Sequence, residues 1–505
     1  MSSAPSPRSD SERVEQLQKQ LRWAELRIQA LEEQLRLERI AKYGPGSEKL
    51  NSAQLELLEL EPGVSREEVD AESKREPPPT DESRKNRKKH PGRQELPPEL
   101  PRVERVIPST VEQCSCQACG RETVVIGYEQ SEQLDVKPAE YFVLLTKREK
   151  RVCQSCEEAG VMTAPLPTRI IDKSLVSDRV IINTVIAKYS DYQPLYRQNV
   201  ILERETGIEI SRATMDGWVM RVGELLIPIV GAMGREILAE SYIQADETPV
   251  DVQTHDNRGK NHQAYLWQYG RPGGCVIFDF RMGRNREGPK RFLGQFEGIL
   301  QSDGYAAYDQ VGGPKMVHAS CWAHSRRKFF DAVKLNPDDK VAARIVAEMN
   351  DLFAIDAEAR AQNLDHAARH TLRTQRARPL LDQIRKHVEA ARVGALPASA
   401  LGKAASYTLT LWSKLTRFLD HPELELSNNL AENSMRPLVL GRKNWIHIGS
   451  QQAGPKVAAI LSIVESCRRL KLPLRDYLAS VLPGLADLPV QQVRRLTPTA
   501  WSASR

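Results

Sequence analysis

The first regular pattern of apolar residues lies near the N-terminus. A heptad seam runs through a stretch of Glu, Gln, Arg and Lys that contains neither Gly nor Pro: Val14, Leu17, Leu21, Ala24, Ile28, Leu31 and Leu35. This spacing predicts one helix over residues 10–43, ending before Gly44-Pro45-Gly46. An apolar seam on an otherwise polar helix favours pairing with a second copy of the chain, and folding back onto its own domain is the alternative.

A second helical pattern covers residues 174–235. Within it, residues 207–219 resemble the turn and second helix of a helix-turn-helix, with Ser211 as the N-cap. Such a helix could read a major groove of DNA, and three-helix packing without DNA contact is the alternative.

Strand-like apolar runs follow, and their order predicts the central domain. The expected strands are residues 241–245, 264–269, 276–280, 298–302 and 316–319, with a short helix near 290–296. The order β-β-β-α-β-α-β, with a second helix expected between the last two strands, is that of a ribonuclease H-like domain that lacks its last helix. Residues 325–421 have helical periodicity throughout, so we expect an all-helical insertion before a last helix that begins near Asn429.

The predicted fold class is therefore multidomain α+β, with a ribonuclease H-like catalytic core interrupted by an all-helical insertion. The expected order is a coiled coil (10–43), a basic Pro-rich linker (44–107), a zinc-binding module (108–160), a helical, helix-turn-helix-like DNA-binding region (165–235), the first part of the core (236–324), the insertion (325–425), the last part of the core (426–470) and a C-terminal element (471–505). A length of 505 residues agrees with such a division, since it favours about three or four domains.

Basic residues are clustered rather than abundant. The formal net charge is only +6, but local groups could neutralise phosphates: the run from Arg84 to His90 in the linker, and the candidate DNA-binding residues Arg326, Arg327, Lys328, Arg436, Arg442 and Lys443. A solvated surface is the alternative for any one cluster taken alone.

Five of the eight cysteines lie in one short stretch. Two CxxC knuckles, Cys116 with Cys119 and Cys153 with Cys156, predict one tetrahedral structural Zn²⁺, with a redox pair as the weaker alternative. Cys114 is a spare thiol that could replace Cys116. The cysteine spacing indicates metal binding rather than disulfides, and the sequence shows neither a signal sequence nor a long apolar run. These features predict a cytoplasmic protein without a membrane contact.

Three separate acidic segments could carry chemistry on a phosphodiester. Asp246 and Asp303 each follow an apolar strand, and Glu432 falls in the first turn of the late helix. Carboxylates placed in this way could hold two Mg²⁺ ions, or Mn²⁺ in their place, for displacement at phosphorus. Glu247 competes with Asp246 but should face the other side of its strand. Glu465 competes with Glu432 and is expected to be an ordinary residue on a helix surface.

Two further features lie in or beside the insertion. Cys321 and His324 lack two more ligands for zinc, so packing the insertion against the site is the favoured interpretation, and contact of His324 with DNA is the alternative. Trp412 could stack on an unpaired base, but core packing is favoured.

Several motifs together resemble the IS66 family of insertion-sequence transposases. They are residues 188–198, residues 321–330, residues 428–445, the Ser47-Glu48-Lys49-Leu50 segment and the paired CxxC. The resemblance implies a DDE transposase whose metal-binding triad is Asp246, Asp303 and Glu432, with Cys321 and His324 as the family's CxxH signature at the entrance of the insertion. It also implies accessory proteins from the same element and recognition of terminal inverted repeats.

The sequence therefore predicts an enzyme that cleaves the ends of its element and joins the 3′-hydroxyl to target DNA. The N-terminal coil would make a homodimer or higher oligomer. Two rivals remain: a zinc-containing DNA-binding regulator whose nuclease-like domain is inactive, and a structure-specific nuclease that hydrolyses DNA without joining it.

Overall fold

The computed structural model describes residues 10–43, 141–146, 150–152, 161–163, 165, 167–254 and 260–504. The four expected zinc ligands and the basic linker lie outside these residues. Helix α1 (Asp10–Tyr43) covers the heptad seam, whose apolar side chains Val14, Leu17, Leu21, Ile28, Leu31 and Leu35 are between 53% and 62% exposed in the single chain. Strands β1 (Lys150–Val152) and β2 (Val161–Thr163) form a small antiparallel pair.

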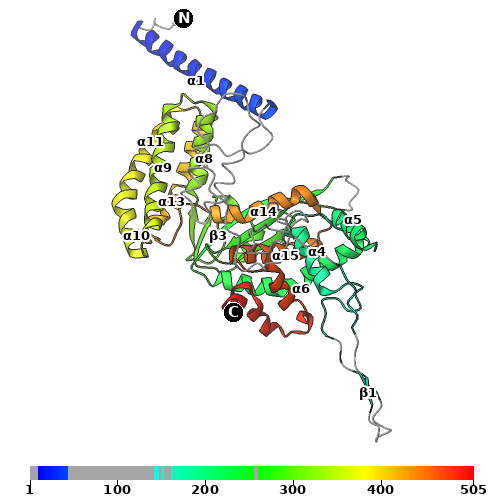
Figure 1. Cartoon of the computed structure of the whole chain (residues 1–505). Helices are drawn as coiled ribbons and strands as arrows, with labels where there is room; N and C mark the ends of the chain where they lie inside the picture. Colours follow the sequence, from blue (N-terminus) through cyan, green and yellow to red (C-terminus); the bar gives the residue numbers. More distant parts are fainter. Residues whose placement is uncertain are drawn as a thin grey trace, which may run out of the picture. The chain divides into compact units, whose positions relative to one another are not determined.

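A mixed sheet forms the centre of the larger unit (Figure 1). Its strands are β3 (Tyr242–Val252), β4 (His262–Gly270), β5 (Val276–Arg281), β6 (Ile299–Ser302), β7 (Val317–Ser320) and β8 (His447–Ile448). Their order is β5-β4-β3-β6-β7, with β8 beside the far end of β3. The first three strands are antiparallel and β3, β6 and β7 are parallel, so the five expected strands are confirmed.

Two elements between these strands differ in detail from the prediction. The helix before β6 is α7 (Glu287–Leu293), and the segment between β6 and β7 forms only the short 3₁₀ helix η2 (Ala306–Tyr308). Strand β8 was not expected, since two residues carry no strand pattern of their own.

A group of helices from before and after the strands packs on the sheet and on one another. These are α4 (Asp178–Tyr189), α5 (Leu195–Thr206), α6 (Arg212–Leu238), α15 (Ala453–Arg469) and α16 (Leu474–Val481), followed by η5 (Leu485–Asp487), η6 (Val490–Leu496) and α17 (Pro498–Ala503). On the edge strand β5, the backbone amides of Val276 and Phe278 donate to Ser466 Oγ (3.0 Å) and Ser462 Oγ (2.8 Å) of α15. The serine hydroxyls of this helix thus accept hydrogen bonds from backbone amides of the edge strand that would otherwise be free to pair with another chain.

Helix α6 begins as expected, because Ser211 Oγ accepts a hydrogen bond from Thr214 N at 3.1 Å. It then continues for 27 residues, and its buried residues, among them Trp218, Val222 and Leu226, belong to the main hydrophobic core. Among the described residues it is the one helix with the length and apolar composition to cross a membrane. Because its apolar side chains are packed inside the protein, this composition does not indicate a membrane protein.

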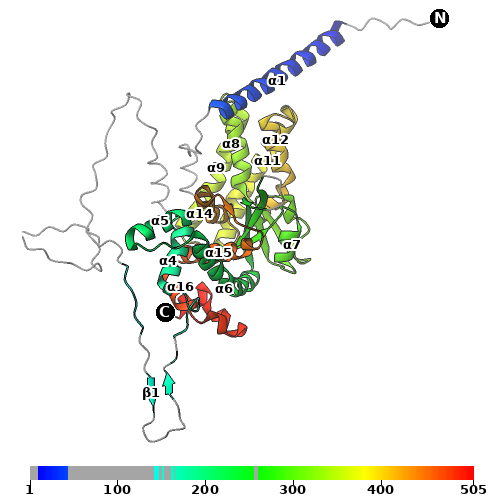
Figure 2. The same ribbon diagram turned by 90° about the vertical axis from the view of Figure 1, so that its right-hand side faces the viewer.

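The segment after β7 is helical, as predicted. It contains α8 (Trp322–Leu335), α9 (Lys340–Ala361), α10 (His366–Leu372), the π-helical turn η3 (Arg373–Ala377), α11 (Arg378–Gly394), α12 (Ala400–Thr410), α13 (Trp412–Leu415) and η4 (Thr416–Leu419). Helices α8, α9, α11 and α12 contact one another around a separate hydrophobic core (Figure 2). The chain then returns to the sheet as α14 (Asn429–Trp445), which packs on β3 and β4.

Candidate active site

The register of the sheet places the two aspartates at matching positions. Strands β3 and β6 run parallel, and Gln244 pairs with Gln301 at the end of their shared ladder. Asp246 and Asp303 each follow two residues later, so both carboxylates lie just past the point where the two strands separate. Asp246 is inside the long strand β3 rather than after its end, because β3 continues along β4 to Val252.

Several contacts hold Asp303 in the loop after β6. Its carboxylate Oδ1 accepts from Tyr305 N at 2.8 Å, and its carbonyl accepts from the Tyr407 hydroxyl of the helical segment. Gly304 has a φ of 92°, a value that residues with a β-carbon rarely adopt. The loop is therefore shaped by both the sheet and the helical segment.

Glu432 comes from the first turn of α14, as the sequence predicted. Asn428 occupies the N-cap position, but its side chain does not cap the helix; Nδ2 donates instead to Ala245 O on β3, at 3.4 Å. This contact brings the start of α14 beside Asp246. Glu432 Oε2 is 3.3 Å from Arg327 Nη2, and Glu432 Oε1 is 3.3 Å from His324 Nε2.

Three other acidic side chains lie close enough to Asp246 for their charges to act on it. Burial raises the pKa of Asp246 well above its usual range, and the negative charges of Glu432, Glu247 and Asp303 raise it further. Of the three acids that the sequence singled out, Asp303 and Glu432 thus both lie within electrostatic range of Asp246.

Glu247 has other partners, as strand alternation requires. Its side chain is 2% exposed, its Oε1 is 2.7 Å from Arg284 Nη2, and its Oε2 accepts from the Tyr308 hydroxyl at 2.9 Å. Asp246 instead lies on the face of β3 that carries Gln244, whose side chain contacts the chain just before α14. Glu465 is also excluded: it is buried rather than on a helix surface, and both of its oxygens bond to Arg468 at 2.8 Å.

The donor set suits a hard divalent cation. Carboxylate oxygens are the ligands that Mg²⁺ prefers, and a cation would relieve the repulsion among these acids. Two buried oxygens near the start of α14, Asn428 Oδ1 and Asn429 Oδ1, have no hydrogen-bond partner. Among the residues that the structure describes, however, no three acidic, histidine or cysteine side chains are already gathered closely enough to hold an ion.

The candidate DNA-binding residues separate into exposed and buried ones. Arg327, Lys328, Arg436 and Lys443 are exposed, whereas Arg442 is partly buried and donates to Thr248 Oγ1 at 3.1 Å. Arg326 is 3% exposed and donates to Asn350 Oδ1 at 2.6 Å. Arg326 is therefore not available to contact DNA, because its guanidinium faces the interior of the helical segment.

The Cys321 and His324 pair lies at the junction of the sheet and the helical segment. Cys321 is buried at the start of α8 and its Sγ accepts from Asn428 N at 3.4 Å, so this thiol helps to hold the approach to α14. His324, one turn later, reaches Glu432. Trp412 is partly buried and packs edge-on against Trp322, with ring centroids 5.7 Å apart.

Sequence reasoning missed the glutamines that precede both aspartates. Gln244 and Gln301 are each 1% exposed and bond to the backbone just before α14. The available signal was the repeated Gln-X-Asp pattern, at Gln244-Ala245-Asp246 and Gln301-Ser302-Asp303.

Three family models match the chain. Residues 173–456 match the family described as "Transposase IS66 family", residues 30–105 match "Transposase C of IS166 homeodomain", and residues 113–157 match "zinc-finger binding domain of transposase IS66". The last match spans all four expected zinc ligands and supports a structural Zn²⁺.

Three relatives from Sinorhizobium fredii are similar over most of the chain. The uncharacterized protein y4jD is 31% identical over 81% of this chain and 82% of its own length. The uncharacterized protein y4qI is 30% identical over 79% and 75%, and y4hP is 27% identical over 94% and 88%. Since the family match covers more than half of the sequence, the chain belongs to the IS66 family of insertion-sequence transposases.

Proposed function

We propose that the protein is a DDE transposase with a ribonuclease H-like core, in which Asp246, Asp303 and Glu432 form the metal-binding triad. The observation that supports the proposal is that Asp303, after β6, and Glu432, on α14, lie close enough to Asp246 on β3 for their charges to raise its pKa. The strand order, with three antiparallel strands followed by two parallel ones, supports the fold assignment. The helical segment from α8 to η4 is then the insertion of this core.

The three carboxylates would hold two Mg²⁺ ions, with Mn²⁺ as a substitute, which activate the attacking hydroxyl and stabilise the leaving oxygen when bound. The chain's own residues supply the rest of the site. The Tyr305 amide and Tyr407 hydroxyl fix the loop of Asp303, and Arg327 keeps a positive charge 3.3 Å from Glu432. We expect His324 and Arg327, which both contact Glu432, to approach the phosphates of a bound DNA end.

The exposed basic residues support DNA as the substrate. Arg327 and Lys328 lie on α8, which contacts Glu432 through Arg327, and Arg436 and Lys443 lie on α14, the helix that carries Glu432. Their charges would hold the backbone of the element's terminal inverted repeat and of the target DNA. The zinc module, the α4–α6 region and the linker would add contacts to the ends.

The exposed apolar seam of α1 would pair two or more protomers, so that two ends of one element are held together. Accessory proteins from the same element and a cytoplasmic location complete the proposal.

A strand-transfer assay tests the chemistry. Purified protein is incubated with labelled ends of its own element, Mg²⁺ and a target plasmid, and joined product is measured. We expect joining by the wild type and none by Asp246→Ala, Asp303→Ala or Glu432→Ala. Glu465→Ala is tested beside them as the acid that the structure excludes.

Other results would support a rival function. Cleavage without joining would indicate a nuclease, and binding without cleavage would indicate a regulator. Undiminished strand transfer by all three triad variants would refute the assignment of the triad.

A further inference from the structure

The five residues before α14 are held one by one. Residues 424–428, here called the strap, make a hydrogen bond at every position: Leu424 O accepts from Arg373 Nη2 (2.7 Å), Glu425 O from Gln301 Nε2 (2.7 Å), Leu426 O from Trp322 N (2.8 Å) and Ser427 O from Gln244 Nε2 (3.0 Å), and Asn428 N donates to Cys321 Sγ (3.4 Å). A connecting segment is rarely fixed so completely, because most connections are exposed and mobile.

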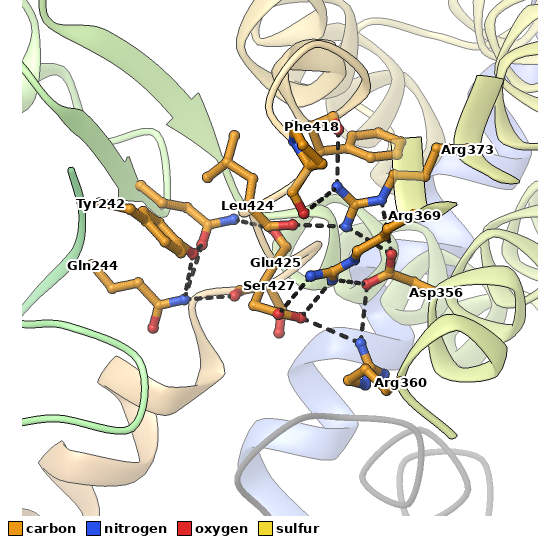
Figure 3. A network of polar contacts seen from close by, with 12 residues as sticks. Tyr242, Gln244, Asp356, Arg360, Arg369, Arg373, Phe418, Leu424, Glu425 and Ser427 are labelled. Carbon is orange, nitrogen blue, oxygen red and sulfur yellow. Dashed lines mark hydrogen bonds and ion pairs between the residues drawn. The ribbon is translucent and has the colours of Figure 1, made fainter. Parts of the chain in front are cut away.

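One side of the strap is held by a buried ionic cluster of the helical insertion (Figure 3). Asp356 on α9 is 2% exposed and accepts from Arg373 (2.7 and 2.9 Å), Arg369 (2.8 Å) and Arg360 (3.0 Å). Arg369 and Arg360 also bond to the Glu425 carboxylate, at 3.1 to 3.3 Å. Guanidinium groups that are hydrogen-bonded in this way fix the orientation of the carboxylates and carbonyls that they bind.

The other side of the strap is held by the two strands that carry the aspartates. Gln244 and Gln301 lie two residues before Asp246 and Asp303, and Figure 3 shows the Gln244 and Tyr242 side chains directed toward the strap. The Tyr242 hydroxyl donates to Gln301 Oε1 at 2.5 Å, and Gln244 Nε2 is 2.9 Å from the same hydroxyl. Both amide groups are thereby oriented with their NH₂ donors toward strap carbonyls.

The strap in turn determines where α14 begins. Asn428 O accepts from Ala431 N (2.8 Å) and Glu432 N (3.2 Å), which forms the first turn of the helix. A shift of the strap would therefore move Glu432 relative to Asp246 and Asp303. An error of about 1 Å in the position of a catalytic group can reduce a rate by about 100-fold.

We propose that Gln244 and Gln301 are positioning residues that, together with the Asp356 cluster of the insertion, set the distance of Glu432 from the two aspartates. This inference rests on the proposed function, since it assigns the insertion a role at that metal site. The insertion then holds the helix that carries Glu432 in position, and it also carries the exposed basic residues Arg327 and Lys328. A hydrophobic contact could stabilise the junction equally well, but it would not fix the strap at each carbonyl.

The test measures metal binding and catalysis in the full-length protein. Mn²⁺ alone is titrated and followed by electron paramagnetic resonance, for the wild type, Asp303→Ala, Gln244→Met and Gln301→Met. Methionine has nearly the volume of glutamine but cannot donate to the strap. Gln263→Met, on the exposed part of β4, is the matched control. Affinity for the element's end and the rate of strand transfer are measured in parallel.

We expect Gln244→Met and Gln301→Met to weaken Mn²⁺ binding about tenfold, the lower end of the range for residues that orient metal ligands. The rate of strand transfer should fall by at least as much, while the affinity for DNA stays within about twofold, because the exposed basic residues are unchanged. A residue that only stabilised the fold would lower the melting temperature without this separation of metal affinity from DNA affinity.

Two outcomes separate failure of this inference from failure of the proposed function. If the wild type binds Mn²⁺ in a manner that Asp303→Ala abolishes, but both glutamine variants match Gln263→Met, the positioning role is wrong and the triad stands. If Asp303→Ala binds Mn²⁺ like the wild type, or if the wild type binds none, the triad and the positioning role both fail.

Discussion

Replacing Gly304 with alanine tests how tightly the loop of Asp303 is held against the insertion. Gly304 has a φ of 92°, and an added β-carbon would overlap Leu411 Cδ1 and lie 3.1 Å from Leu411 Cδ2. Leu411 is 6% exposed in the core of the insertion, so its side chain has little room to move. Gly273 offers a matched control, because its φ is 71° but no atom lies within 4 Å of an added β-carbon.

The two substitutions share one cost and differ in the other. A positive φ destabilises an alanine by about 1–2 kcal/mol at either position. Overpacking against Leu411 adds about 1–3 kcal/mol at Gly304 alone. We therefore expect Gly304→Ala to lower the free energy of unfolding by about 2–5 kcal/mol and Gly273→Ala by about 1–2 kcal/mol.

Urea denaturation measures these free energies, and a double-mutant cycle with Leu411→Ala isolates the overlap. The added methyl group should cost about 1–3 kcal/mol less in the Leu411→Ala background than in the wild type, since the space has been opened. Strand transfer should also fall in Gly304→Ala, because the neighbouring Asp303 must shift. Equal destabilisation by Gly304→Ala and Gly273→Ala, without coupling to Leu411, would refute the close contact between loop and insertion.

Three further predictions concern the buried ions, the acidic site and the zinc module. Arg373→Met leaves Asp356 without its fully buried partner and several carbonyls unpaired, so it should lower the free energy of unfolding by about 3–5 kcal/mol in urea denaturation. Arg376→Met removes an exposed ion pair with Glu358 and should lower it by less than about 1 kcal/mol. Similar losses in the two variants would contradict the buried cluster. Because the pKa of Asp246 is raised in the folded state, its ionisation reduces stability as the pH rises above about 4, and the loss is complete above the folded pKa. In EDTA, Asp246→Asn should therefore melt at a higher temperature than the wild type at pH 7, with a gain that disappears toward pH ~4; no gain at pH 7 would show that the carboxylates are not crowded. Elemental analysis should find about one zinc per chain, lost in Cys153→Ser, and full retention of zinc would remove Cys153 from the ligand set.

Local sequence patterns were sufficient to predict the secondary structure of the catalytic region. Short apolar runs predicted the five strands from β3 to β7, and helical periodicity predicted the helical segment that follows them. These patterns are local, since each depends on which face of one element is buried. The acidic candidates were found for the same reason: Asp246 and Asp303 follow apolar runs, and Glu432 follows helix-capping residues.

Burial of individual charged residues could not be predicted in this way. Arg326 and Arg327 are neighbours in a basic run, yet one bonds to Asn350 inside the insertion and the other reaches Glu432. Successive residues on a helix point about 100° apart, and only the packing of α8 against α9 decides which of them faces inward. Glu465 was predicted to lie on a helix surface because the sequence does not show which face of its helix is covered. In the structure, the packing of α15 buries it.

The sequence by itself predicted most of the elements, the family and the three acidic candidates, because each leaves a local or motif-level pattern. Only the tertiary structure decided how Glu432 reaches two aspartates from which the whole insertion separates it. Glu432 approaches Asp246 because the strap bonds to Gln244, Gln301 and Arg373, and these residues belong to β3, β6 and the insertion. Hydrogen bonds between residues so distant along the chain leave no periodic pattern in the sequence, since they form only when the separate elements have packed together.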